Sequence, residues 1–298
     1  MRKDQQTQNS STLKKRKVIK MAQGKEVIEG AGVRLKRVIG NNELEDVDPF
    51  LLLDEFRSDK PDDYIAGFPT HPHRGFETVT YMIEGFMEHK DSTGRSGVLK
   101  PGGAQWMTAG SGILHSEIPK QKEGLLWGFQ LWVNLPADKK MTDPRYQNIE
   151  PEDIPELRTD DGVVIKVIAG KVSDTTGPVT GIETDPLYID VTLPPKCVFT
   201  QKVQKGHSAI VYMIDGAGLL DDENNMKVGA MTGSLALFGE GDYIDVSAVD
   251  KPARFLMLSA RPLNEPVTRY GPFVMNTKDQ IEKAFDDYRS GKLVSATP

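Results

Sequence analysis

The chain has 298 residues, 38% of them hydrophobic and 27% charged, with no apolar run near the ~18 residues of a membrane-spanning helix. The length suits two domains, and the single cysteine excludes an internal disulfide. The net charge of −6 argues against nucleic-acid binding by the folded part, so we expect neither membrane nor direct nucleic-acid association.

The first 24 residues are predicted to form a basic, disordered tail. Residues 1–20 carry seven Lys or Arg against one acid. The run Lys14–Lys17 is of the kind that nuclear import receptors read, and the alternative is a solvated charge run without a signal. On the first interpretation we expect the protein in the nucleus and the cytoplasm.

From residue 25 onward the chain is a series of short β-rich segments separated by Gly, Pro, Asp and Asn. Residues 77–83 and 163–168 are examples, and many short strands with frequent turn signals indicate an all-β barrel or sandwich. The acidic, proline-containing stretch at 146–160 predicts a linker. It separates an N-terminal domain at 25–145 from a C-terminal domain at 161–298.

Three of the five histidines lie in two short pieces of the N-terminal domain. His71 and His73 are two residues apart, and so are His115 and Glu117. On a strand, residues i and i+2 project from the same face about 7 Å apart, so each piece can present two ligands together. Neighbouring strands would then place three imidazoles and one carboxylate around one point, which predicts a metal site. A lone His-x-His would more simply be a pair of surface or capping histidines.

Other polar residues carry weaker signals. His89 lies in a predicted hairpin turn and His207 precedes a predicted strand, so we interpret both as structural or solvated. Arg74, Gln105 and Trp106 flank the predicted metal site and could shape its mouth, although packing or turn roles explain them equally well.

An internal repeat indicates two copies of one β-domain. Residues 78–85 (TVTYMIEG) recur at 209–216 as AIVYMIDG, and residues 101–104 are echoed at 231–234. Two echoes in the same order, at nearly the same offset, are hard to attribute to chance.

The second copy lacks the candidate ligands. At the offset of the repeat, His71 and His73 correspond to Lys202 and Gln204. The second domain thus keeps the strand but lacks the ligands, as expected if only the first domain binds a metal. We therefore expect one metal ion per chain.

One stretch near the C-terminus predicts a helix. Thr277 and Gln280 form a capping box, and Gly291 supplies a stop. The apolar residues between them fall on one face at helical spacing, as core packing requires: Ile281, Ala284, Phe285 and Tyr288.

Four segments carry a family resemblance. HPHRGFETVTYMIEG (71–85) resembles the first cupin motif, and PGGAQWMTAGSGILHSE (101–117) resembles the second in its pirin form. GFQLWVNLP (128–136) and EPVTRYGPFVMNT (265–277) are also similar to pirins. The resemblance covers about residues 26–293 and implies a bicupin, that is, two tandem cupin β-barrels, with a short C-terminal helix.

The resemblance to pirins also implies the ligand set. The metal ligands of the family fall on His71, His73, His115 and Glu117. The general cupin pattern would offer Glu77 as the carboxylate instead. We favour Glu117. Glu77 has the same strand parity and remains a candidate for supporting the ligands from behind.

The expected metal is Fe(II). Three imidazoles and a carboxylate without thiolate suit Fe(II) and also Mn, Ni, Cu or Zn, and four protein ligands leave positions open in an octahedral ion. The resemblance to iron-containing pirins makes iron the first choice.

Two functions follow from the resemblance. Some pirins act on flavonols such as quercetin, which implies quercetin 2,3-dioxygenase-type ring opening with Glu117 as both ligand and catalytic base. The family also includes nuclear proteins that assist transcription factors, which implies the alternative of a metal- and redox-dependent transcriptional co-regulator. The expected partners are therefore a flavonol-like small molecule, or transcription factors and signalling proteins.

Overall fold

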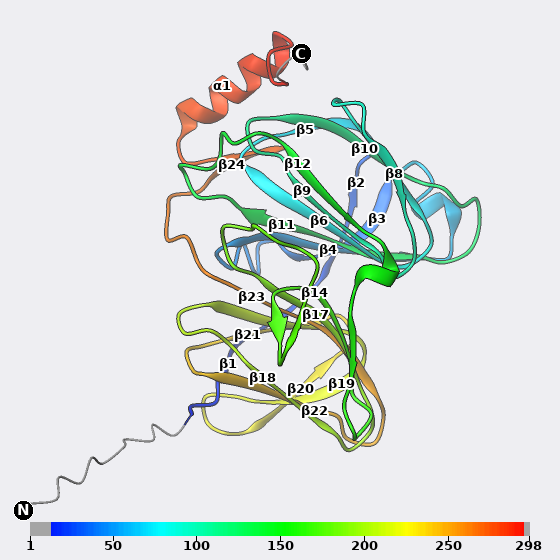
Figure 1. Cartoon of the computed structure of the whole chain (residues 1–298), viewed down its shortest axis with the longest axis vertical. Coiled ribbons are helices and arrows are strands. Elements are labelled where there is room, and N and C mark those ends of the chain that lie inside the picture. Colours follow the sequence, from blue (N-terminus) through cyan, green and yellow to red (C-terminus); the bar gives the residue numbers. More distant parts are fainter. Residues whose placement is uncertain (1–12, 295–298) are drawn as a thin grey trace, which may run out of the picture.

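Strands form nearly all of the regular secondary structure, as predicted. The computed structural model describes residues 13–294, and Figure 1 shows two β-barrels, one above the other, with a single α-helix at the far side of the upper barrel. The all-β, two-barrel prediction is confirmed. That helix, the longest between residues 13 and 294, has 12 residues and cannot cross a bilayer.

The upper, N-terminal barrel combines two antiparallel sheets. The seven-stranded sheet has the order β12 (Arg145–Ile149), β9 (Ala104–Thr108), β6 (Phe76–Glu84), β11 (Leu126–Asn134), β4 (Phe50–Ser58), β3 (Val33–Ile39) and β2 (Lys25–Glu29). The four-stranded sheet has the order β5 (Phe68–His73), β10 (Ile113–Pro119), β7 (Met87–Asp91) and β8 (Ser96–Leu99).

The lower, C-terminal barrel is one branched ten-stranded sheet. Its main path is β1 (Val18–Gln23), β21 (Ser234–Phe238), β19 (Ser208–Asp221), β23 (Ala253–Ala260), β17 (Leu187–Leu193), β14 (Val164–Ala169) and β13 (Glu156–Arg158). Three further strands pair beside this path: β18 (Val198–Lys202), β20 (Lys227–Met231) and β22 (Tyr243–Ser247).

The remaining elements are short. They are the hairpins β15 (Lys171–Val172) with β16 (Thr175–Thr176) and β24 (Thr268–Tyr270) with β25 (Phe273–Met275), two 3₁₀ turns, η1 (Pro61–Asp63) and η2 (Pro151–Asp153), and the helix α1 (Lys278–Arg289). The helix begins at the predicted capping box, in which the Thr277 side chain accepts from the Gln280 amide and the Gln280 side chain accepts in return.

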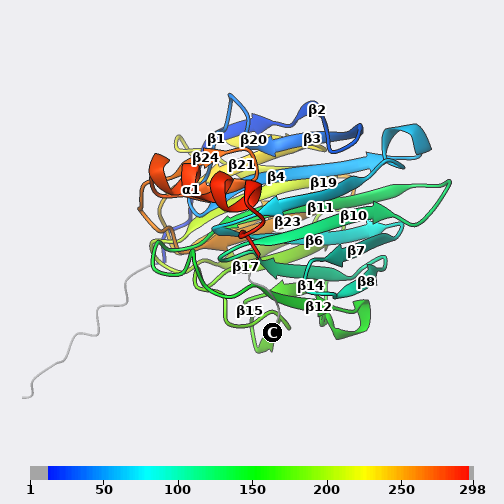
Figure 2. The ribbon, with the colours of Figure 1, turned by 90° about the horizontal axis from the view of Figure 1, so that it is seen from above.

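The two ends of the chain cross to opposite barrels. At the N-terminal end, β1 pairs with β21 of the C-terminal barrel. At the other end, the segment 265–294, with β24, β25 and α1, returns to the N-terminal barrel, where Phe273 bridges to Arg74 and the Lys140 ammonium donates to Val274 O at 3.2 Å. Figures 1 and 2 show α1 lying over the N-terminal barrel. We call the segment 265–275 the strap.

The prediction of a disordered tail up to residue 24 is wrong for its second half. Residues 1–12 lie outside the described part, but β1 begins at Val18. The Arg16 side chain is buried and donates to three backbone carbonyls of the C-terminal barrel, those of Gln204, His207 and Gly241. These partners lie far away in sequence, so local composition could not reveal them.

The same contacts weaken the case for Lys14–Lys17 as a nuclear signal. Lys15 forms ion pairs with Asp221 and Asp245, at 2.9 and 2.6 Å, and the neighbouring Arg16 is buried. An import receptor needs these side chains in solvent, so it would have to displace the segment from the barrel first.

Both barrels extend strands into the expected linker at 146–160. Residues 146–149 belong to β12, which pairs with β9 of the N-terminal barrel, and residues 156–158 form β13 of the C-terminal barrel. The passage between the barrels is thereby reduced to 150–155, which holds the turn η2.

The strand pairing confirms the internal repeat. In the first barrel β6 lies between β9 and β11, and in the second barrel β19 lies between β21 and β23. The two strands that share the sequence echo therefore occupy equivalent places.

The faces of β6 and β19 that point away from the barrel interiors pack against each other. Two tyrosines that correspond in the repeat bridge this interface reciprocally: Tyr81 donates to Asp190 Oδ2 at 2.8 Å, and Tyr212 donates to Glu55 Oε2 at 2.6 Å. Each acid lies two strands from the tyrosine of its own barrel at the same register. The largest apolar cluster, which includes Ile210, surrounds these bridges, so the barrels share one core.

The two barrel interiors differ. The C-terminal barrel is filled by apolar side chains, among them Val211, Phe255 and Met257. The N-terminal barrel holds a smaller apolar cluster and leaves a cavity of about 600 Å³. This cavity is where the candidate site lies.

Candidate metal centre

Two adjacent strands place the histidines. On β5, His71 and His73 follow the two-residue alternation of a strand, with Pro72 between them. β5 ends at His73, and Gly75, with a φ of +89°, turns the chain into β6. Antiparallel pairing of β10 with β5 sets His115 directly opposite His71. The predicted neighbouring strands are therefore present.

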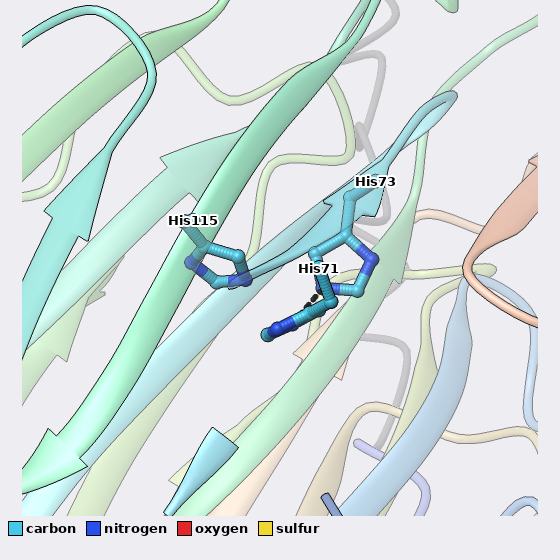
Figure 3. Close-up of side chains that lie close together, drawn as sticks. All are labelled: His71, His73 and His115. Atoms are coloured by element: carbon cyan, nitrogen blue, oxygen red, sulfur yellow. Dashed lines mark hydrogen bonds between the residues drawn. The ribbon is translucent and has the colours of Figure 1, made fainter. Parts of the chain in front are cut away.

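The three imidazoles converge. One nitrogen from each of His71, His73 and His115 lies within 4.8 Å of the other two, and Figure 3 shows the rings turned toward one another. The Nε2 atoms of His71 and His73 are 3.0 Å apart, and the three ring centroids are 4.4–4.9 Å apart. It is the one such cluster of His, Cys, Asp or Glu found in the described part of the chain.

Burial keeps these imidazoles neutral. Desolvation lowers the pKa of His71, and it lowers the pKa values of His73 and His115 well below the usual histidine range, with the neighbouring imidazoles as a further cause. A neutral imidazole with a free nitrogen is the form that binds metals.

The backbone orients two of the three rings. The Nδ1 atom of His71 lies 2.8 Å from Pro69 O, and that of His73 lies 3.3 Å from Pro272 O. Pro272 belongs to the strap, so the end of the chain helps to hold a candidate ligand of the N-terminal barrel. For His115 no hydrogen-bond partner is found within residues 13–294.

Glu117 lines the same cavity but is not part of the three-histidine cluster. A register shift separates it from His115 in the pairing with β5. Its Oε1 accepts from Thr80 Oγ1 at 2.9 Å and its Oε2 from Gln130 Nε2 at 3.3 Å. Burial is the main cause that raises the pKa of Glu117 to about 7. As a fourth ligand, Glu117 therefore stays a prediction.

The assignment of Glu77 to the ligands' surroundings is wrong. Phe76, its neighbour on β6, packs against the His73 ring at 5.0 Å, and Thr80 on the same face bonds Glu117, so Glu77 points to the opposite face of the sheet. There its Oε1 accepts from Thr108. Parity counted from the histidines fails because the turn at Gly75 interrupts the strand.

The flanking residues have structural roles. Arg74 forms an ion pair with Asp287 of α1 at 2.8 Å, and Gln105 donates to Asn148. Trp106 is buried in the core shared by the barrels. None of the three lines the cavity, so the expectation that they shape its mouth is not met.

His89 lies closer to the site than its sequence context indicated. It belongs to β7 rather than to the turn, and it pairs with Glu117 of the neighbouring strand β10. Its side chain is buried, with the ring centroid 5.2 Å from that of His115. Burial lowers the pKa of His89 to about 4. The turn signal in EHKDSTG is correct but begins at Asp91, whose Oδ1 accepts from the Thr93 amide.

The cavity is apolar inside and charged at its rim. Its walls include Leu35, Leu52, Phe56, Phe68, Met87 and Trp132, together with His71, His73 and Glu117. At the rim the guanidinium of the exposed Arg269, from the strap, stacks 4.5 Å from the Trp132 ring. A larger and more polar hollow of about 910 Å³ lies over β2 and β3 and contains no histidine, so we assign the chemistry to the smaller cavity.

The donor set fits a divalent transition metal. Two imidazole nitrogens lie 3.0 Å apart, a third imidazole has no hydrogen-bond partner in the described part of the chain, and a buried carboxylate is nearby. Together they give the N/O ligands that such ions prefer. The absence of thiolate at the cluster does not favour a structural Cys-type zinc site.

Comparison with known proteins points to one family. The model for "Pirin" matches residues 32–133, and that for "Pirin C-terminal cupin domain" matches residues 188–294. A Pseudomonas aeruginosa protein, provisionally named a quercetin 2,3-dioxygenase, is 48% identical over 93% of this chain and 98% of its own length. Human pirin is 42% identical over 93% of each chain. A crystal structure of a quercetin 2,3-dioxygenase from Acinetobacter baumannii matches with a TM-score of 0.86 at 36% identity, covering 95% of this chain and all of the other.

Proposed function

The chain belongs to the pirin family, and on this premise we propose that it is a metal-dependent dioxygenase that opens the ring of a flavonol such as quercetin. The observation that carries the proposal is the cluster of three imidazoles opening onto an apolar cavity of about 600 Å³. The similarity to proteins named quercetin 2,3-dioxygenase supports the substrate class.

His71, His73, His115 and Glu117 would hold the metal, with one ion per chain. Iron(II) is our first choice, and Mn, Ni, Cu and Zn are the alternatives that the same ligands accept. When bound, iron would act as a Lewis acid that makes a coordinated hydroxyl more acidic, and it would bring dioxygen and the substrate together.

The cavity walls would orient the substrate. A flavonol is a flat aromatic molecule, and the side chains of Leu52, Phe56 and Trp132 offer it apolar contacts that exclude water. Arg269 at the rim has hydrogen-bond donors for a phenolic oxygen at the outer end of such a molecule. The substrate would then enter with its reacting end toward the histidines.

Glu117 would take the proton of the flavonol 3-hydroxyl. Because burial raises its pKa to about 7, this carboxylate is basic enough to accept a proton near neutral pH, which an ordinary glutamate is not. The hydroxyl proton would move to a carboxylate oxygen, while Thr80 and Gln130 keep that carboxylate in place.

Two substitutions separate the ligand role of Glu117 from its role as a base. Glu117→Gln keeps the size and an oxygen donor but removes the basicity, so iron-saturated enzyme should remain about 10²–10⁴-fold slower. His71→Ala should act mainly through loss of metal.

The matched control is Glu77→Gln, which changes a buried glutamate of β6 that points away from the cavity and should leave turnover intact. Full recovery of turnover by Glu117→Gln at saturating iron would disprove the role as a base. A protein without any flavonol oxygenase activity after iron loading would disprove the proposed function.

A further inference from the structure

A group of buried polar atoms behind His115 has no hydrogen-bond partner within the described residues. The group comprises both ring nitrogens of His89, Asp91 Oδ2, Tyr146 Oη and both ring nitrogens of His115. An unpaired buried polar atom destabilises the folded state, so several in one place require an explanation.

These side chains come together from three strands. On β7 and β10, His115 pairs with Asp91 and Glu117 pairs with His89. These pairs are two positions apart, so all four side chains lie on one face of the ladder. Tyr146, from β12, reaches in from the segment that was expected to be a linker, and its ring centroid lies 4.9 Å from that of His89. The ring of His89 therefore packs against both that of Tyr146 and that of His115, whose centroid lies 5.2 Å away.

The two carboxylate oxygens of Asp91 have different surroundings. Its Oδ1 accepts from the amides of Thr93 and Arg95 and from the Thr93 hydroxyl, which closes the β7–β8 turn. Its Oδ2 points into the buried group, 4.0 Å from His89 Nε2. That separation is too long for a direct hydrogen bond.

Tyr146 lies close enough to Asp91 to interact electrostatically with its carboxylate. Its burial, followed by the charge of Asp91, raises the pKa of the phenol, so it remains a neutral hydrogen-bond donor. A donor, a carboxylate oxygen and an imidazole whose two nitrogens have no hydrogen-bond partner among residues 13–294 therefore lie close together. A water molecule, which needs two to four such partners, matches this arrangement.

His115 differs from the other two candidate ligands in what holds its ring. His71 and His73 each have a backbone carbonyl at the nitrogen opposite the cluster. Metal-binding histidines almost always have such a partner, because it fixes the ring and its tautomer.

We propose that buried water bound by His89, Asp91 and Tyr146 supplies this missing partner to His115, which makes these three residues positioning residues of the metal centre. The inference rests on the metal site of the proposed function but not on its substrate. Water linked to Asp91 would hold the His115 ring in place and increase its basicity toward the metal. The pairing of β7 with β10 would thereby fix both His115 and Glu117.

The test uses Tyr146→Phe and Asp91→Asn in the full chain, loaded with Co(II) as a spectroscopic probe. Each variant keeps the shape of the side chain and removes one hydrogen-bonding function. We expect both to weaken Co(II) affinity about 10- to 100-fold, measured by competition with a chelator, and to change the visible absorption bands of the ion. The control is Tyr188→Phe in the C-terminal barrel, which removes another buried hydroxyl for which residues 13–294 offer no partner, and it should leave both readouts unchanged.

A crystal structure of the metal-loaded protein adds a direct check. Water within hydrogen-bond distance of His115 and of Asp91 or Tyr146 is expected. Unchanged Co(II) affinity and spectrum in both variants, or a dry cluster in the crystal, would overturn the inference. Tight Co(II) binding that depends on Tyr146, in a protein that turns over no flavonol, would disprove the proposed function and leave this inference standing.

Discussion

The reciprocal tyrosine bridges between the barrels predict unequal costs for two equivalent substitutions. Tyr81→Phe removes one donor from Asp190, but that carboxylate keeps two hydrogen bonds from Arg254, at 3.0 and 2.6 Å. Tyr212→Phe removes the hydrogen bond to Glu55 Oε2, for which no other protein donor is found between residues 13 and 294.

The magnitudes follow from these partners. A hydrogen bond to a charged group contributes about 1.5–3 kcal/mol, and an unpaired buried acceptor adds its own cost. After Tyr212→Phe, the one side-chain donor that the described residues still offer Glu55 is Trp127 Nε1, on its other oxygen. We therefore expect Tyr212→Phe to lower the free energy of unfolding by about 2–3 kcal/mol and Tyr81→Phe by about 1 kcal/mol.

Chemical denaturation of the two variants under identical conditions measures this difference. Glu55→Gln combined with Tyr212→Phe should show strong coupling in a double-mutant cycle, because the two side chains share one hydrogen bond. Equal costs for the two tyrosine variants, or a larger cost for Tyr81→Phe, would refute the reasoning from the partners of each acid.

Three further predictions concern the chain end, the metal and the turn after the histidines. Deletion of residues 1–20 should lower the melting temperature, because it removes the three hydrogen bonds of buried Arg16; an unchanged temperature would show that these contacts contribute nothing. Metal affinity should fall about tenfold per pH unit below about 7, the pKa of Glu117, because a proton on this carboxylate competes with the metal. Above that pH the affinity should stay level, since the histidines are already neutral. Release of two or more protons per ion at pH 6 would contradict this. Gly75→Ala should lower the free energy of unfolding by more than about 3 kcal/mol, because a Cβ there would lie 2.0 Å from a strap carbonyl oxygen at a φ of +89°. The control Gly229→Ala, at an open position, should be tolerated. Similar unfolding curves for both variants would contradict the close approach of the strap.

The spacing of residues predicted the core of the site. His71, His73 and His115 could be assigned because a strand imposes a two-residue period, and the period survives in β5 and β10. Glu77 was misplaced because that period stops at the positive-φ turn at Gly75. Strand parity is reliable only within one uninterrupted strand.

Contacts between distant segments could not be predicted. Arg16 looks like part of a charged tail, and its carbonyl acceptors lie about 190–225 residues away. Pro272 O, which contacts His73, is equally remote, and nothing in the sequence near either residue marks the contact. The position of His89 beside the site was predictable from the sequence. If the turn is taken to begin at Asp91, His89 falls on the preceding strand, two residues from Asp91 and on the same face.

The most direct test of the proposed function is an anaerobic titration of iron-loaded protein with quercetin, followed by its absorption spectrum. We predict a shift of the quercetin band that saturates at one flavonol and one iron per chain and is absent in His73→Ala. The same shift in iron-free protein, or no shift at all with iron bound, would contradict the claim that this cavity presents a flavonol to a metal held by His71, His73 and His115.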